Sequence, residues 1–158
     1  MSTHTERQMV ARNKRAFHDY AISDTYEAGL VLSGTEVKSL RAGGGSIAEA
    51  FGRVRDGEVW LLNANIPPYA MRGYADHEPK RPRKLLLHRK EIRRIQKALE
   101  EKGYTLVPLS LYFNARGVAK VKMALARGKR MGDRREDVKK RDAKREVERE
   151  MARSRKGR

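Results

Sequence analysis

YTLVPLSLYF at residues 104–113 and AKVKMAL at residues 119–125 set the fold class of this 158-residue chain. One face of the first segment would carry the apolar residues Val107, Leu109, Leu111 and Phe113. In the second segment, apolar residues alternate with Lys120 and Lys122. Such alternation predicts two β-strands, and the short Gly-containing segment between them predicts a turn. Pro108 has no backbone N–H to donate, so we expect the first strand to be bulged there or to lie at a sheet edge.

A second pair of strands is predicted within residues 46–66. Asp56-Gly57 is a strong signal for a tight hairpin turn. Phe51 and Val54 mark the strand before this turn. The strand after it, at residues 59–66, is too apolar to bury only one face, so we expect it to be central in the sheet.

Two helices are predicted between the strands. Ser33 with Glu36 three residues later is a capping box, and Gly43–Gly45 would end the short helix that follows. A longer helix is predicted at residues 88–102, with His88 as its N-cap and glycine after its last turn. Its apolar stripe is formed by Ile92, Ile95 and Leu99.

These elements define one architecture. Residues 17–26 alternate and add another strand, which gives about six strands and two helices with no β-α-β alternation. We therefore predict a mainly β fold with flanking α-helices, in which an antiparallel barrel of the oligonucleotide-binding type precedes a basic C-terminal tail. The predicted division is a flexible N-terminus at 1–12, a barrel domain at 13–126 and the tail at 127–158.

The charge of the chain indicates its class of partner. With a formal net charge of +17, the basic side chains repel one another unless a polyanion screens them, so nucleic acid is the expected partner. An anionic membrane surface is less favoured, because no basic stretch has the broad apolar face of an interfacial helix. No apolar run of about 18 residues could span a membrane, and the N-terminus lacks the apolar core of a signal peptide. The absence of cysteine excludes disulfides and thiolate metal sites, and it fits a reducing cytoplasm.

The tail, residues 127–158, contains fifteen basic residues, seven acidic residues and no aromatic residue. Most of its residue types favour a helix, and Asp133 with Glu136 has the capping-box spacing. Its few large apolar residues form no stripe, however, so a helix here would have no face to bury. We expect a tail that is disordered alone and becomes helical along a polyanion. The composition leaves open the alternative of a solvated tail that only aids solubility.

No catalytic or metal-binding pattern stands out. Gly43–Gly45 lacks the Gly-Lys-Ser/Thr of a phosphate-binding loop, and the four histidines lack the spacing and acidic partners of a metal site. We therefore expect no enzyme activity, no cofactor and no metal. Basic residues cluster instead on three segments, at Lys38 and Arg41, at Arg81, Arg83 and Lys84, and at Lys120 and Lys122. Their excess over acidic residues predicts that at least one cluster contacts phosphate.

Four blocks of the sequence strongly resemble the SsrA-binding protein family, small protein B (SmpB). They are EAGLVLSGTEVKSLRAG at 27–43, RPRKLLLH at 81–88, KGYTLVPL at 102–109 and ARGKR at 126–130. The blocks occur in the family's order and spacing, and the similarity covers about residues 13–141. The resemblance implies a barrel of the oligonucleotide-binding type that binds transfer-messenger RNA (tmRNA). It also implies trans-translation, in which tmRNA and protein enter a bacterial ribosome that has stalled without a stop codon. The protein would replace the anticodon arm of a tRNA, and its tail would fold in the decoding centre and vacant mRNA channel of the small ribosomal subunit.

The resemblance also implies particular site residues. The tmRNA-facing set is Asn13, Glu27, Leu86 and His88, to which Arg81, Arg83, Lys84 and, more weakly, Lys38 would add phosphate contacts. The ribosome-facing block of the tail is Gly128, Lys129, Arg130, Asp133, Arg134 and Arg135. Gly132 departs from the family, whose members often have a residue there that can stack on a base. Two alternatives stay open: His88 could serve only as a cap, and Glu27 and Leu86 could shape the loop without touching RNA.

Two other functions remain to be weighed. One is a generic RNA-binding or ribosome-assembly protein with the same barrel, and the other is an RNA-modifying enzyme. The absence of an acid–base or metal constellation argues against the enzyme. The four ordered blocks favour ribosome rescue over generic RNA binding.

Overall fold

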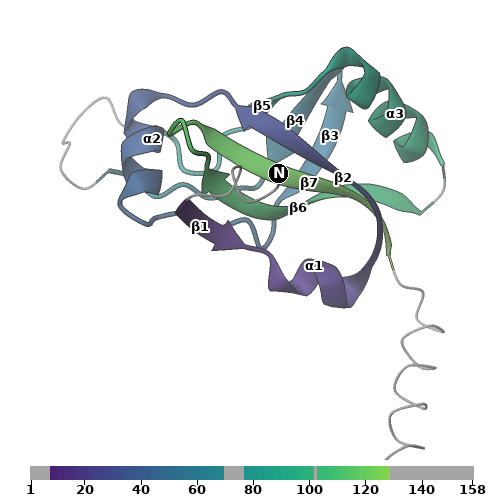
Figure 1. Ribbon diagram of the computed structural model, residues 1–158, viewed down its shortest axis with the longest axis horizontal. Coiled ribbons are helices and arrows are strands. Elements are labelled where there is room, and N and C mark those ends of the chain that lie inside the picture. The colour runs from purple at the N-terminus through teal and green to yellow at the C-terminus, as the bar shows by residue number, and fades with distance from the viewer. Residues whose placement is uncertain (1–7, 70–76, 102, 129–158) are drawn as a thin grey trace, which may run out of the picture. The chain divides into compact units, whose positions relative to one another are not determined.

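The computed structural model describes residues 8–69, 77–101 and 103–128, and within them it has seven strands and three helices (Figure 1). The strands are β1 (Gln8–Arg12), β2 (Tyr20–Leu30), β3 (Phe51–Arg55), β4 (Glu58–Leu62), β5 (Arg83–Leu86), β6 (Tyr104–Phe113) and β7 (Ala119–Gly128). The helices are α1 (Lys14–Asp19), α2 (Gly34–Arg41) and α3 (Arg89–Glu100). The tail was predicted to begin at residue 127, but Arg127 and Gly128 are the last residues of β7, where they pair with Ala21 and Tyr20 of β2. The rest of the predicted tail, from Lys129 onward, lies outside the described residues.

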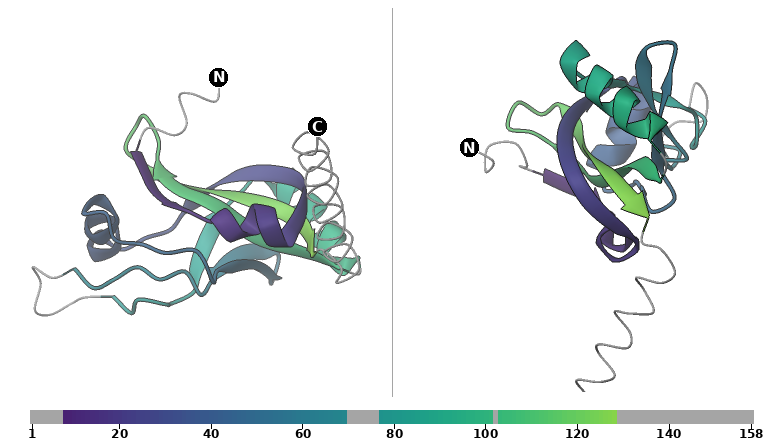
Figure 2. Two further views of the ribbon diagram at one scale, coloured as in Figure 1. Left: turned by 90° about the horizontal axis from the view of Figure 1, so that it is seen from below. Right: turned by 90° about the vertical axis from the view of Figure 1, so that its right-hand side faces the viewer.

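The strands form a closed antiparallel barrel, as the sequence predicted. Their order is β1-β6-β3-β4-β5-β2-β7, and β6 also pairs with β7, which closes the ring. β1 is attached outside the ring, where it pairs with β6. Helices α2 and α3 lie at opposite ends of the barrel, and α1 lies beside β1 (Figure 2).

The hairpin at β3 and β4 is confirmed. Asp56 and Gly57 both have positive φ, 52° and 75°, which is the backbone that a tight two-residue hairpin turn requires. β4 pairs with β3 on one side and with β5 on the other, so it is central in the sheet, as predicted. Val59 and Leu61 point into the barrel core, with 0% and 1% of their surface exposed.

The long hairpin of β6 and β7 confirms the alternation in part. Val121, Met123 and Leu125 of β7 all join the main core. The prediction that four residues of β6 share one face is wrong: Leu111 and Phe113 join the main core, whereas Val107 and Leu109 pack in a second cluster against Ala16 of α1. The cause is the bulge predicted at Pro108. The pairing with β7 shifts between Pro108 and Ser110, and one extra residue reverses the face of everything that follows.

Gly52 closes the seam between β3 and β6, where it pairs with Leu106. A Cβ at residue 52 would lie 2.4 Å from Cδ2 of Leu106, which is itself fully buried. We expect Gly52→Ala to lower the free energy of unfolding by about 1–3 kcal/mol through overpacking, measured by urea denaturation. Gly34→Ala is the matched control, because a Cβ there meets nothing within 4 Å. Equal stability of the two variants would contradict this account of the seam.

Both predicted helices are present and begin as expected. Ser33 and Glu36 form the full capping box of α2, and Gly43 follows its end with a φ of 91°. In α3, Ile95 is buried in the core while Ile92 and Leu99 pack at its edge. The last turn of α3 ends at Glu100, two residues earlier than predicted.

Two elements near the N-terminus differ from the prediction. Lys14–Asp19 forms α1, so the strand that was expected to begin at residue 17 begins at Tyr20. Only Ala16 is buried in this short helix, too little to produce a periodic apolar pattern. β1 occupies Gln8–Arg12, within the segment expected to be flexible, because the exposed side of β6 supplies its hydrogen-bonding partner.

Candidate nucleic-acid interface

A groove of about 560 Å³ runs along the surface where β5 leads into α3. The apolar residues that line it are Leu85, Leu86, Leu87 and Ile92. Three basic residues from different elements, Lys84, Arg89 and Lys120, stand around it. Three acidic residues also line it: Glu27 of β2, Glu58 of β4 and Glu91 of α3. We refer to this surface as the groove.

The sheet places Leu86 at the centre of the groove. β5 pairs with β2 through Gly29 opposite Leu86, and a Cβ on Gly29 would lie 3.3 Å from the Leu86 Cβ. The alternation of β5 then buries Leu85 in the core and leaves Leu86 53% exposed. Exposure of a large apolar side chain between basic residues suits a partner with both phosphates and bases.

Glu27 has an exposed carboxylate that is hydrogen-bonded to a buried tyrosine. The hydroxyl of Tyr112 donates a hydrogen bond to Oε2 of Glu27, and Tyr112 itself is only 1% exposed. A carboxylate repels phosphate, so its fixed position among lysine and arginine residues is suited to another class of donor. Base N–H groups and ribose 2′-hydroxyls of RNA are such donors.

His88 lies where the groove meets α3. Its backbone N–H donates to Oε1 of Glu91 at 3.0 Å, which is one half of the predicted capping box. The groove therefore brings together four residues predicted from the sequence, Glu27, Lys84, Leu86 and His88. They come from β2, from β5 and from the start of α3.

Two basic groove residues were not assigned to this site from the sequence: Lys120 was named only as part of a separate basic cluster, and Arg89 was not named. Lys120 had been grouped with Lys122 on one strand, but it pairs opposite Gly29, which sets it beside the groove. Arg89 is the first residue of α3, and it was not singled out although Lys90, Arg93 and Arg94 lie close to it in the sequence. Only the pairing of β2 with β7, which the alternation pattern does not specify, would have located Lys120.

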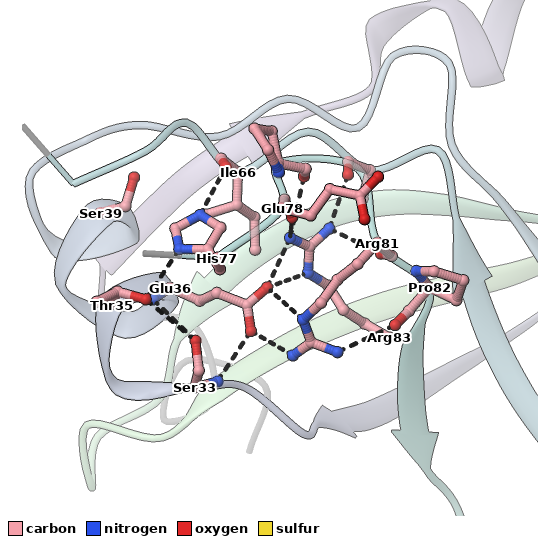
Figure 3. A network of polar contacts seen from close by, with 12 residues as sticks. Ser33, Thr35, Glu36, Ser39, Ile66, His77, Glu78, Arg81, Pro82 and Arg83 are labelled. Carbon is pink, nitrogen blue, oxygen red and sulfur yellow. Dashed lines mark hydrogen bonds and ion pairs between the residues drawn. The ribbon is translucent and has the colours of Figure 1, made fainter. Parts of the chain in front are cut away.

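A buried ionic network lies next to the start of β5 (Figure 3). Glu36 of α2 has no exposed surface, and its carboxylate accepts hydrogen bonds from both Arg81 and Arg83. Arg83 Nε donates to Glu36 Oε2 at 2.6 Å. The remaining donors of this guanidinium reach the carbonyl oxygens of Ala64, Glu78, Pro79 and Arg81. All N–H donors of Arg83 are thus satisfied inside the protein.

This network corrects the expectation for Arg83. Its guanidinium is completely buried and has no surface to offer to a phosphate. Arg81 also binds Glu36, but a third of its side chain, 33%, remains exposed. Lys84 is 36% exposed and lies 2.8 Å from Glu58. The basic segment around residue 83 is therefore mainly a structural junction between α2 and β5.

The network keeps Glu36 ionised. Burial alone would raise the pKa of its carboxyl group, but hydrogen bonds from Arg81, the Ser33 backbone and Arg83 outweigh burial and hold the pKa below its ordinary value. His77 extends the network, since its ring contacts Thr35 Oγ1 at 3.0 Å and the Ile66 carbonyl at 2.8 Å. These contacts fix the described end of the 69–82 segment against α2.

The other predicted residues lie away from the groove. Asn13 is buried at the corner between β1 and α1, where its Nδ2 donates to the Pro108 carbonyl at 3.0 Å. Lys38 is exposed on α2, with its Nζ 6.0 Å from the centre of the Tyr69 ring. Gly128 ends β7 opposite Tyr20. The predicted tail residues Lys129, Arg130, Asp133, Arg134 and Arg135 lie outside the described residues.

Metal ligands and membrane-spanning helices were sought in residues 8–69, 77–101 and 103–128. Within them, no group of three or more His, Asp or Glu residues is placed to hold a metal ion. In the same residues, no helix is long and apolar enough to cross a membrane.

The closed antiparallel barrel and its groove, which combines apolar side chains with Lys84, Arg89 and Lys120, define a small nucleic-acid-binding barrel of the oligonucleotide-binding type. The sequence model of the SmpB protein family matches residues 10–153, and this chain belongs to that family.

Three relatives illustrate the similarity. The SsrA-binding protein of Acidothermus cellulolyticus is 55% identical over 157 residues, which covers 99% of this chain and 98% of that protein. Those of Thermobifida fusca and Sphingomonas elodea are 59% identical over 146 residues and 60% identical over 133 residues. They cover 92% and 84% of this chain, and 91% and 83% of their own lengths. A chain in a solved structure described as "tmRNA-SmpB: a journey to the center of the bacterial ribosome" is 54% identical, with a TM-score of 0.66. That match covers 80% of this chain and 92% of the other.

Proposed function

We propose that this protein binds tmRNA and delivers it to stalled bacterial ribosomes for trans-translation. The observation that carries the proposal is the groove, which unites Glu27, Lys84, Leu86 and His88 from segments far apart in the sequence. Membership of the SmpB family supports the same partner. The protein acts by binding RNA in the cytoplasm, without catalysis, cofactor or metal.

The groove binds a folded, tRNA-like part of tmRNA through three kinds of contact. Lys84, Arg89 and Lys120 attract phosphates, which gives affinity without sequence preference. Leu86 packs against an unstacked base or a ribose. Glu27 accepts hydrogen bonds from base N–H groups or a ribose hydroxyl, and it disfavours a phosphate at the same place. The exposed part of Arg81 and the exposed Lys38 on α2 add phosphate contacts outside the groove.

The barrel binds tmRNA, and the tail binds the ribosome. The barrel grips tmRNA and stands where the anticodon arm of a tRNA would be. The tail continues from the end of β7 and enters the decoding centre and the vacant mRNA channel, where ribosomal RNA screens its charge and a helix forms beyond Gly128. Gly128, Lys129, Arg130, Asp133, Arg134 and Arg135 are the tail residues that we assign to this contact.

A competition experiment tests the proposal against generic RNA binding. At salt high enough to suppress phosphate-only contacts, the protein should bind the tRNA-like part of tmRNA at least about tenfold more tightly than unrelated RNA of equal length. Leu86→Ala should remove most of this preference, because the exposed side chain touches RNA rather than the core. Dissociation constants for both RNAs would be measured by fluorescence anisotropy.

Val118→Ala is the matched control for Leu86→Ala. Val118 is also an exposed apolar residue, at 47%, and it does not line the groove. We expect this variant to keep the preference for the tRNA-like RNA. Equal affinity of the wild-type protein for both RNAs would support the generic RNA-binding alternative instead.

A further inference from the structure

A second surface with aromatic and basic character lies on the outer face of β3, β4 and β5. Val59 and Leu61 point into the barrel, so Trp60 between them points outward. Trp60 pairs directly opposite Arg53 of β3 on one side and opposite Lys84 of β5 on the other. It is the single tryptophan of the chain.

This surface is hollowed rather than flat. A depression of about 550 Å³ is lined by Trp60 together with Leu62, Pro82 and charged residues of the β3–β4 hairpin. Trp60 is therefore partly exposed, next to the apolar residues Leu62 and Pro82. Such a depression can accept a flat apolar group of the size of a nucleobase.

The charges around the depression favour an anion beside the ring. Arg53 and Arg55 are exposed, and within the described residues neither forms an ion pair or a side-chain hydrogen bond. Of the two acidic residues, Glu58 is paired with Lys84 at 2.8 Å, and Asp56 lies in the hairpin turn. The balance of charge around the depression is only slightly positive, so attraction of phosphates alone would hold a ligand weakly. Contact with the ring of Trp60 must therefore contribute to binding.

The depression continues the groove. Glu58 lines both of them, and its partner Lys84 lines the groove. The Lys84–Glu58 pair is thus the ridge that separates the two surfaces. An RNA strand that leaves the groove has a short path over this ridge to Trp60.

We propose that Trp60 stacks an unpaired base of the RNA bound in the groove, with Arg53 and Arg55 facing the flanking phosphates. The base must be unpaired and unstacked, because bases inside a duplex have no free face to offer. Aromatic stacking tolerates any base, so this contact adds affinity and orientation without selecting a sequence. The inference rests on the proposed binding of tmRNA by the groove.

The emission of Trp60 reports on this contact directly. Full-length protein would be titrated with the tRNA-like part of tmRNA, while anisotropy of labelled RNA reports binding independently. We expect emission to fall with the same dissociation constant as the anisotropy change, and the bound ring to be shielded from acrylamide quenching. Binding by anisotropy with unchanged emission and unchanged acrylamide access would overturn the inference and leave the proposed function intact. No binding by anisotropy would overturn both.

Two substitutions separate stacking from packing. Trp60→Leu keeps an apolar side chain beside Leu62 but removes the ring, and we expect about tenfold weaker binding of the same RNA. Trp60→Phe keeps a ring and should bind within about threefold of wild type. Phe17→Leu is the matched control, since Phe17 is an aromatic residue of α1 that is 65% exposed and lies outside both surfaces. Wild-type affinity of Trp60→Leu, or emission changes that require added ribosomes, would contradict the proposal.

Discussion

A chain that ends at Gly128 is expected to bind the tRNA-like part of tmRNA nearly as tightly as the full chain and to lose tagging of stalled peptides completely. Gly128 is the last residue of β7, so the cut leaves every described element in place. It removes fourteen basic and seven acidic residues. Binding at moderate salt should weaken by no more than about threefold, because contacts that depend only on net charge are screened there. Tagging would be measured on ribosomes stalled without a stop codon in a purified translation system.

Two full-length variants distinguish a specific tail contact from bulk charge. Replacing Lys129, Arg130, Arg134 and Arg135 by Ala should stop tagging after tmRNA has been delivered. The matched control replaces Arg149, Arg153, Arg155 and Lys156 by Ala and removes the same charge from the end of the tail. We expect the control to keep most tagging activity. Equal loss in both variants, or loss of tmRNA binding in the shortened chain, would contradict the division of labour between barrel and tail.

Glu36→Gln should destabilise the barrel by about 4 kcal/mol, since removing one partner of a buried ion pair leaves the other charges uncompensated. Glu36 and Arg83 are both fully buried, and they tie α2 to the start of β5. The loss would be measured as the free energy of unfolding in urea. Glu58→Gln is the matched control. It makes the same chemical change in the pair with Lys84, whose partners are 36% and 42% exposed, and it should cost at most about 1 kcal/mol.

The pH dependence gives an independent test of Glu36. Its pKa is lowered in the folded protein, so the network's contribution is present above the unfolded pKa of about 4.3 and is lost as pH falls through the folded value. The stability difference between wild type and Glu36→Gln should be full at neutral pH and should shrink in acid. A difference that stays constant down to the acid transition would show that Glu36 is not held ionised by Arg81 and Arg83.

Local signals in the sequence predicted much of the fold. The alternation of β7, the Asp56-Gly57 turn and the capping box at Ser33 and Glu36 each depend on residues close together in the chain. The structure confirms all three. The possibility of a bulge at Pro108 was also predicted. A bulge reverses the faces of the residues that follow it, and this reversal was not applied to Leu111 and Phe113, so their face was predicted wrongly.

Features that depend on distant partners could not be read from the sequence. β1 forms because β6, about a hundred residues later in the chain, supplies its hydrogen-bonding partner. Arg83 was expected to contact phosphate because it belongs to a basic cluster with Arg81 and Lys84. Its burial requires Glu36, which lies 47 residues earlier. Lys120 reaches the groove only through the pairing of β7 with β2. The family resemblance located Glu27, Leu86 and His88, whereas the shape of the surface around them came from the structure.

The central claim is that the groove recognises tmRNA, and the affinity of Glu27→Gln for the tRNA-like part of tmRNA tests it most directly. Binding through phosphate attraction alone and recognition by the Glu27 carboxylate predict opposite changes in this affinity. The substitution removes one of the negative charges that line the groove, so binding through phosphate attraction alone would become tighter. Recognition of RNA donors by the carboxylate predicts binding weaker by about tenfold at constant salt. Glu49→Gln, at a carboxylate whose side chain is 79% exposed outside the groove, is the control for charge and should not weaken binding. Unchanged or tighter binding by Glu27→Gln would contradict the groove as the site that recognises tmRNA.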